Sequence, residues 1–255
     1  MTTQQLGRPL ASRINIGPWV LQRNSAKEGR TYLRPLGTVE RCYYLDSQRL
    51  RGATDTLHRI IVEVHGRGRQ PEEVFSPVNV RRAWIMMKRR FPLLGAHIQQ
   101  EDEDGRNVCF VVNNADLERL SQGEVEFGHT RSGKEVEEFM DTLLNGERPL
   151  SNQLLIRLFI FAEPEHRYHI ILYSAHCVSD GVAIYSLSRS LLEEIASPSN
   201  GKLWKLEQRL ALAMPQDDLT PTARFTLPKQ RWRVAIAKVI CSLRSQKSSV
   251  SLARH

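Results

Sequence analysis

Residues 168–196 read YHIILYSAHCVSDGVAIYSLSRSLLEEIA, and this stretch decides the fold class of the chain. Tyr168 to Ser174 is almost entirely apolar, which is typical of a strand inside a sheet. The polar turn Ala175 to Gly181 follows, and then apolar residues recur at helical spacing: Ile184, Leu187, Leu191, Leu192 and Ile195. A strand end aims a side chain rigidly and a turn leaves it reachable, so His176 is a candidate for chemistry.

The rest of the chain alternates between strand and helix patterns. We predict further strands over Glu40 to Leu45, Thr56 to Val64, Ala96 to Gln100, Asn107 to Val112 and Leu154 to Phe161. The turn Glu163 to His166 should join the last of these to Tyr168–Ser174 as an antiparallel hairpin. This alternation is typical of the α/β class.

Helix boundaries are marked by capping residues. A helix should begin at Ser76-Pro77, because serine suits the N-cap and proline loses no bond at the next position, and it should end before Pro92. Ser132 and Glu135 have the capping-box spacing ahead of a second helix, which Asn145-Gly146 should end. A short helix is expected around Leu203 to Leu212.

Composition excludes several classes of protein. Of the 36 Lys and Arg residues, eight follow Asp218, where no acidic residue occurs; the first 218 residues are therefore neutral, with 28 charges of each sign. This distribution argues against a nucleic-acid partner. No run approaches the roughly 20 apolar residues of a membrane span, and residues 1–10 lack the core of a signal peptide. We therefore expect a cytoplasmic protein without a membrane partner.

The cysteines are Cys42, Cys109, Cys177 and Cys241, and their spacing suggests neither a zinc site nor a disulfide framework. We expect reduced thiols and no metal. Cys177 beside His176 is poorly placed as a nucleophile, because adjacent residues on an extended backbone point apart.

His176, Asp180 and Gly181 match the pattern H-x-x-x-D-G. Here the sequence resembles the superfamily of chloramphenicol acetyltransferase, plant BAHD acyltransferases, fungal trichothecene-type acetyltransferases and condensation domains, whose signature is H-H-x-x-x-D-G between a core strand and a helix. Ala175 stands where the signature has its first histidine. The segments Arg34 to Glu40 (RPLGTVE) and Arg90 to Leu94 (RFPLL) are also similar to segments of that superfamily.

The resemblance implies an α/β lobe of the chloramphenicol acetyltransferase type, with a mixed β-sheet flanked by helices. It also implies an acyltransferase in which His176 is the general base. The acyl donor would be acyl-CoA or a carrier-bound acyl thioester, used as a co-substrate with no bound cofactor, and the acceptor a hydroxyl or amine of a small molecule. A fungal-type role in secondary metabolism would follow. Imidazole, with a reference pKa near 6.5, suits proton removal at neutral pH. In the superfamily the motif's aspartate, here Asp180, pairs with an arginine and holds the turn, and Gly181 permits a backbone conformation that other residues resist.

A plainer interpretation of the same residues stays open. His176 would then be an ordinary hydrogen-bonded histidine at a strand end, and Asp180 a helix N-cap in a common Asp-Gly turn. The other histidines, His58, His65, His97, His129, His166 and His169, show no metal-like spacing and are expected to be structural or exposed.

The resemblance covers about residues 31–200, preceded by a loosely structured segment 1–30. Two-lobed members are roughly twice as long, so the chain resembles their N-terminal lobe alone. Either a homo-oligomer or a partner lobe would complete the site, or the chain is a truncated non-catalytic lobe that acts as a binding or assembly element.

Residues 201–255 form a proline-containing linker followed by a basic amphipathic helix. Its apolar residues are spaced i, i+3, i+4, i+7, i+8 and i+11: Trp232, Ala235, Ile236, Val239, Ile240 and Leu243. Three roles are open for this helix: packing on the body, lying on an anionic membrane, or binding a partner protein.

Overall fold

The computed structural model describes residues 15–16, 19–22, 29–65, 70–100, 107–199 and 204–215, with isolated positions between 218 and 239. The chain forms two compact units, residues 1–214 and residues 215–255. In the second unit the described positions 228, 229, 231, 232, 235, 236 and 239 are helical. The rest of the predicted amphipathic helix lies outside the described residues.

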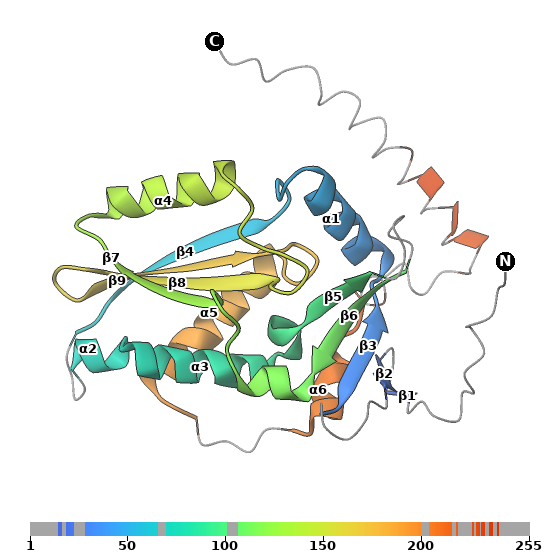
Figure 1. Cartoon of the computed structure of the whole chain (residues 1–255), viewed down its shortest axis with the longest axis horizontal. Coiled ribbons are helices and arrows are strands. Elements are labelled where there is room, and N and C mark those ends of the chain that lie inside the picture. The colour runs from blue at the N-terminus through green and yellow to red at the C-terminus, as the bar shows by residue number, and fades with distance from the viewer. Residues whose placement is uncertain are drawn as a thin grey trace, which may run out of the picture. The chain divides into compact units, whose positions relative to one another are not determined.

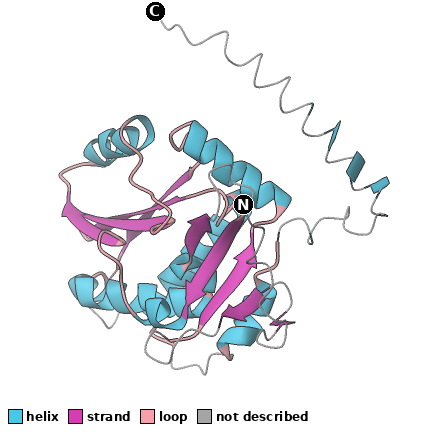
Figure 2. Cartoon of the chain, turned by 45° about the vertical axis from the view of Figure 1, so that its right-hand side comes forward, coloured by secondary structure: helices cyan, strands magenta, loops and turns pink. Residues whose placement is uncertain are grey.

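Two sheets form the framework of the first unit, and Figure 2 shows them as separate groups of strands. Sheet A has the order β1-β2-β3-β6-β5, and all its pairs are antiparallel. Its strands are β1 (Asn15–Ile16), β2 (Trp19–Gln22), β3 (Thr31–Pro35), β5 (His97–Gln100) and β6 (Val108–Asn113). Sheet B has the order β4-β9-β8-β7, with β7 and β8 parallel, and is therefore mixed. Its strands are β4 (Thr56–Glu63), β7 (Val125–His129), β8 (Ile156–Glu163) and β9 (Arg167–Ser174).

Helices cover both faces of sheet B (Figure 1). The α-helices are α1 (Thr38–Arg49), α2 (Pro71–Val74), α3 (Pro77–Arg90), α4 (Gly133–Asn145), α5 (Gly181–Ala196) and α6 (Leu206–Leu212), and the 3-10 helices are η2 (Pro92–Gly95) and η3 (Asn114–Glu118). One core cluster joins α3 and α5 to β8 and β9, and the other joins α1, α4 and sheet A to the opposite face. Among the described residues no helix is both long and apolar enough to cross a bilayer. The predicted α/β architecture is confirmed.

Strand β9 lies inside sheet B and is buried on both faces. Ile170 and Leu172 face the cluster with α3 and α5, whereas Ile171 and Tyr173 face the cluster with α1 and α4. Alternate side chains of a strand point to opposite faces, so a strand covered on both sides needs apolar residues at nearly every position. The predicted antiparallel hairpin is confirmed, with β8 paired to β9 from Ile156–Ser174 to Glu163–Arg167.

Helix α3 begins as its sequence predicts. Ser76 is the N-cap, and its hydroxyl accepts a hydrogen bond from the backbone N–H of Asn79 at 3.3 Å. Pro77 occupies the first helical position, and the helix ends at Arg90, before Pro92. Val80, Trp84 and Met87 form its buried face.

The strand predicted over Glu40 to Leu45 is wrong, because these residues belong to helix α1. The Glu40 carboxylate accepts the free backbone N–H of Gly37 at 2.7 Å, which stabilises the first turn. The buried positions Glu40, Tyr44 and Ser47 recur at helical spacing. Helical capping and packing therefore outweigh the strand preference of two adjacent tyrosines.

Helix α4 is confirmed between Ser132 and Gly146, but its predicted capping box is wrong. The Ser132 side chain makes no capping bond. Instead Glu135 accepts the backbone N–H of Arg131 and the hydroxyl of Thr130, both at 2.9 Å. The Glu135 carboxylate therefore binds the backbone N–H of Arg131, one residue before the N–H of Ser132 that the S-x-x-E pattern predicts.

The segment predicted to be loosely structured, residues 1–30, contains β1 and β2. Trp19 on β2 is completely buried, and its indole N–H donates to the Ala213 carbonyl at 3.0 Å, beyond α6. The remainder of that segment, apart from residues 29 and 30, lies outside the described residues.

Candidate active site

His176 lies in the short turn between β9 and α5. The backbone N–H of Ala175 donates to the Leu155 carbonyl at 2.8 Å and continues the β8–β9 pairing past the end of the strand. Val178 then donates to the Ala175 carbonyl at 2.9 Å and closes a turn. His176 is half-buried and held from both sides by regular structure.

One hydrogen bond assigns the imidazole tautomer. Nδ1 of His176 lies 3.1 Å from the carbonyl oxygen of Ser179. A carbonyl only accepts, so Nδ1 carries the proton and Nε2 of the neutral ring presents a lone pair. Within the described residues, no hydrogen bond to Nε2 occurs. This is the state that a general base requires before reaction.

Tyr43 of α1 stacks on the His176 ring, with the ring centroids 3.8 Å apart and the planes 14° from parallel. The stack restricts rotation of the imidazole, while the Ser179 carbonyl fixes its direction. Tyr43 was not among the residues predicted for the site, because residues 40–45 have the composition of a strand and because the contact joins segments far apart in the chain.

Helix α1 is anchored to three other elements, which places Tyr43. Glu40 forms two 2.8 Å hydrogen bonds with Arg34 of β3, Tyr44 donates to Gln100 of β5 at 3.0 Å, and Ser47 donates to Asp55 at 2.7 Å. Asp55 is itself held by Arg148, with Nε 2.6 Å from Oδ2. The Arg34 and Glu40 side chains are buried, and their paired hydrogen bonds offset the cost of removing two charges from water.

Asp180 is the N-cap of α5. Its Oδ1 accepts the backbone N–H groups of Val182 at 3.0 Å and Ala183 at 2.7 Å. In the described part of the chain no arginine pairs with it, so the pairing that the resemblance implied is not found. The cap directs the turn, because it sets where α5 begins relative to His176.

Gly181 is the first residue of α5. It does not have a positive φ, and a Cβ built on it would meet no atom within 4 Å. The expectation that this position needs a conformation other residues resist is therefore wrong. Local space and backbone geometry both tolerate a side chain here.

The Cys177 side chain belongs to the hydrophobic core. Its side chain is buried, and burial, followed by the negative charges of Glu40 and Asp55, raises the pKa of the thiol to about 12. The thiol therefore stays protonated near neutral pH and is a poor nucleophile.

We expect iodoacetamide at pH 8 to alkylate the exposed Cys42 in the folded protein and to leave Cys177 unmodified. Alkylation requires thiolate, and a raised pKa together with burial suppresses it. Peptide mass mapping after timed labelling measures this, with urea-unfolded protein as the control in which both cysteines react. Equal labelling rates for the two in the folded state would contradict the buried environment of Cys177.

His169 has the structural role expected of it. It is completely buried, Arg59 Nε donates to its Nδ1 at 3.2 Å, and its Nε2 lies 2.7 Å from the Glu163 carboxylate. With both ring nitrogens occupied, His169 has no free lone pair for catalysis.

The surface beside His176 carries apolar groups in contact with solvent. Val182 and Tyr185, on the first two turns of α5, are 78% and 66% exposed. Tyr185 also contacts His58 of β4 edge to face, with the ring centroids 4.6 Å apart. Three clefts are described on this chain, and His176 lines none of them.

No family model matches this sequence, and no curated protein sequence matches it. Several solved structures nevertheless have folds similar to that of this chain. The TRI3 trichothecene 15-O-acetyltransferase of Fusarium sporotrichioides matches with a TM-score of 0.63 at 12% identity, over 87% of this chain and 47% of that one. The condensation domain of the monacolin K polyketide synthase matches with a TM-score of 0.53 at 12% identity, over 75% of this chain and 40% of that one.

The first condensation domain of the calcium-dependent antibiotic synthetase has a TM-score of 0.52 at 15% identity, over 78% of this chain and 46% of that one. The fold predicted from the resemblance is confirmed: the chain has the fold of condensation domains and of this acetyltransferase. It spans less than half the length of these structures.

Proposed function

We propose that this chain carries the general base of an acyltransferase that moves an acyl group from acyl-CoA or a carrier-bound thioester to a hydroxyl or amine of a small molecule. The observation that carries the proposal is the geometry of His176: its Nδ1 lies 3.1 Å from the Ser179 carbonyl oxygen, and in the described part of the chain no hydrogen bond occupies its Nε2. The fold supports it, since the structures that share it are named as an O-acetyltransferase and condensation domains.

The proposed reaction uses Nε2 of His176 as the proton acceptor. Nε2 of His176 removes the proton of the acceptor's O–H or N–H group as that oxygen or nitrogen attacks the thioester carbonyl. The tetrahedral intermediate then collapses with cleavage of the C–S bond, and the leaving sulfur takes the proton from the imidazolium. Neutral imidazole is regenerated, and no covalent acyl-enzyme forms.

The proposal includes a second lobe, from another copy of this chain or from a partner. An isolated half-buried base would have neither an enclosed substrate nor a donor for the developing oxyanion. The exposed Val182 and Tyr185 beside the motif offer apolar surface for such a lobe. A cytoplasmic, fungal-type role in secondary metabolism is part of the same proposal.

The proposal is tested by combining the mass from light scattering with thiol release from acetyl-CoA and longer acyl-CoAs, in the presence of small alcohols and amines. We expect a dimer or trimer that releases thiol faster than buffer. A monomer whose release equals that of buffer would contradict an enzyme completed by a second copy of this chain. It would favour the alternative, a lobe without catalysis of its own that acts in binding or assembly.

Tyr43 should act as a positioning residue for His176. We expect Tyr43→Leu to lower kcat about twofold to tenfold with little change in KM, because a stacked aromatic pair contributes about 0.5–1.5 kcal/mol. Tyr43→Phe keeps the stack and should stay within about twofold of the wild type. If the Leu and Phe variants lost equal activity, the phenol hydroxyl and not the stacked ring would be the important group.

A further inference from the structure

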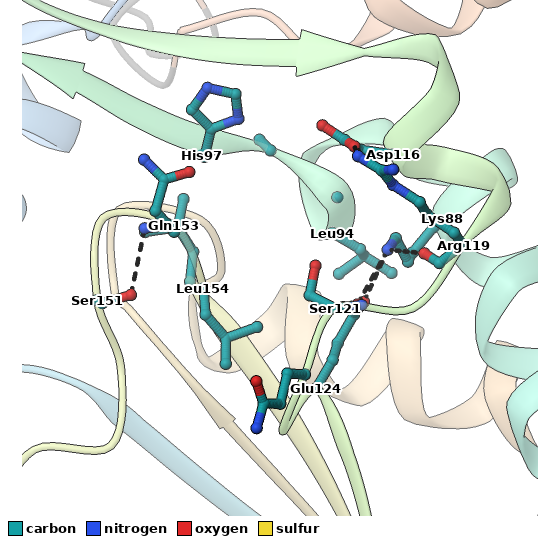
Figure 3. Close-up of a pocket in the computed structure, with 14 residues that line it drawn as sticks. Lys88, Leu94, His97, Asp116, Arg119, Ser121, Glu124, Ser151, Gln153 and Leu154 are labelled. Carbon is teal, nitrogen blue, oxygen red and sulfur yellow. Dashed lines mark hydrogen bonds and ion pairs between the residues drawn. The ribbon is translucent and has the colours of Figure 1, made fainter.

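A cleft that His176 does not line lies between the segment that precedes β8 and the segment that precedes β7. Its volume is about 430 Å³, which falls within the range of about 300–1,000 Å³ typical of small-molecule sites. Figure 3 shows Ser151, Gln153 and Leu154 on one side and Asp116, Arg119 and Ser121 on the other, with His97 of β5 also in the wall. We call it the His97 cleft.

The charged groups of the His97 cleft neutralise one another. Lys88 and Glu124 are both buried, and the Lys88 ammonium donates to Glu124 at 3.0 Å and to the Arg119 carbonyl at 2.7 Å. Glu124 also accepts from Trp84 Nε1 at 2.7 Å. At the rim, Arg119 pairs with Asp116 at 2.6 Å. Two cations therefore face two anions, and no net charge remains to recruit an ion.

Four neutral polar side chains of the cleft have no hydrogen-bond partner among the described residues. In the part of the chain that the structure describes, the side chains of His97, Ser121, Gln122 and Gln153 line the cleft and make no hydrogen bond. Burial lowers the pKa of His97, and the nearby Asp116 opposes this shift only in part. The imidazole is therefore neutral at pH 7, so each of the four side chains can both donate and accept a hydrogen bond.

Apolar side chains also line the cleft. They include Leu94, Ala96 and Leu155, which are buried. Apolar groups beside groups that both donate and accept match a molecule with a ring of C–H bonds and a rim of hydroxyls, which themselves donate and accept.

We propose that the His97 cleft binds a small neutral polyhydroxylated ring, a cyclitol or monosaccharide, through Gln153, Ser121 and His97. This site is separate from His176 and does not depend on acyl transfer. A charged sugar should bind less well, because the cleft offers its charge no unpaired partner.

Saturation-transfer NMR titration of the full chain tests this, with myo-inositol and glucose as neutral probes and glucuronate and glucosamine as matched anionic and cationic probes. We expect saturable binding of a neutral probe, at least about fivefold tighter than binding of either charged sugar. Gln153→Ala and His97→Ala should each weaken binding about fivefold to tenfold. The control is Gln99→Ala, an exposed glutamine on the same strand that lies outside the cleft, and it should change nothing.

Gln153 is exposed, so its substitution should leave the circular dichroism spectrum and melting temperature unchanged and keep the test valid. The proposal would be overturned by tighter binding of glucuronate or glucosamine than of glucose, by no saturable binding of either neutral probe, or by cleft variants that bind like the Gln99 control. His176→Ala should retain sugar binding, so failure of the acyltransferase proposal and failure of this one are distinguishable.

Discussion

His176→Ala should reduce the rate of acyl transfer by about 10²- to 10⁴-fold, with kcat falling and KM nearly unchanged. General base catalysis contributes a factor of this size, and alanine provides no atom that can accept the proton of the acceptor. A loss confined to kcat is expected when the missing group acts in the transition state and not in substrate binding. Thiol release from acyl-CoA, measured on protein of unchanged oligomeric state, gives both constants.

The matched control is His129→Gln, which removes an exposed histidine from the end of β7. It should keep activity within about twofold of the wild type, because His129 lies at a strand end remote from the β9–α5 turn in the sheet order. Full activity in His176→Ala would overturn the assignment of the base. It would leave His176 as a structural histidine, held by Ser179 and Tyr43.

Arg34→Met should lower the free energy of unfolding by about 3–5 kcal/mol, because it leaves the buried Glu40 carboxylate without its partner. The Arg34 and Glu40 side chains are 0% and 8% exposed, and two hydrogen bonds of 2.8 Å join them. Arg34 also lies between the rings of Trp19 and Phe110, at 5.3 Å and 5.1 Å. Urea unfolding followed by circular dichroism measures the change.

The double variant Arg34→Met/Glu40→Gln should regain part of this loss, because a neutral amide is cheaper to bury than an unpaired carboxylate and still accepts from Gly37. Arg189→Met, which breaks the exposed Arg189–Glu193 pair on α5, should change stability by about 0.5 kcal/mol or less. A loss below about 1 kcal/mol for Arg34→Met would show that the buried pair does not anchor α1.

The part of the site that lies within one stretch of chain could be predicted from the sequence. The apolar run of β9, the turn with His176 and the amphipathic helix α5 are encoded in consecutive residues, and local patterns suffice to identify them. The Ser76-Pro77 start of α3 was predictable for the same reason, since a cap depends on neighbours three residues away.

Two expectations that the structure corrects, the strand over residues 40–45 and the arginine pairing of Asp180, have different causes. The segment 40–45 has the composition of a strand but forms a helix, because Glu40 is held by Arg34 and by Gly37, and Tyr44 packs in the core. The role of Asp180 was also taken from the resemblance, whereas its own neighbours Val182 and Ala183 provide the hydrogen bonds. In the first case a distant partner decided the structure, and in the second a local one did.

The α/β class, the strand–turn–helix around His176 and the absence of net charge before Asp218 can be read from the amino-acid sequence, because each depends on composition or on residues close together in the chain. The stacking of Tyr43 on His176 and the existence of the His97 cleft emerged only from the three-dimensional fold. These features arise where α1, β5 and the segments before β7 and β8 meet the rest of the fold. Contacts of that kind depend on the packing of elements far apart in sequence, which local patterns do not encode.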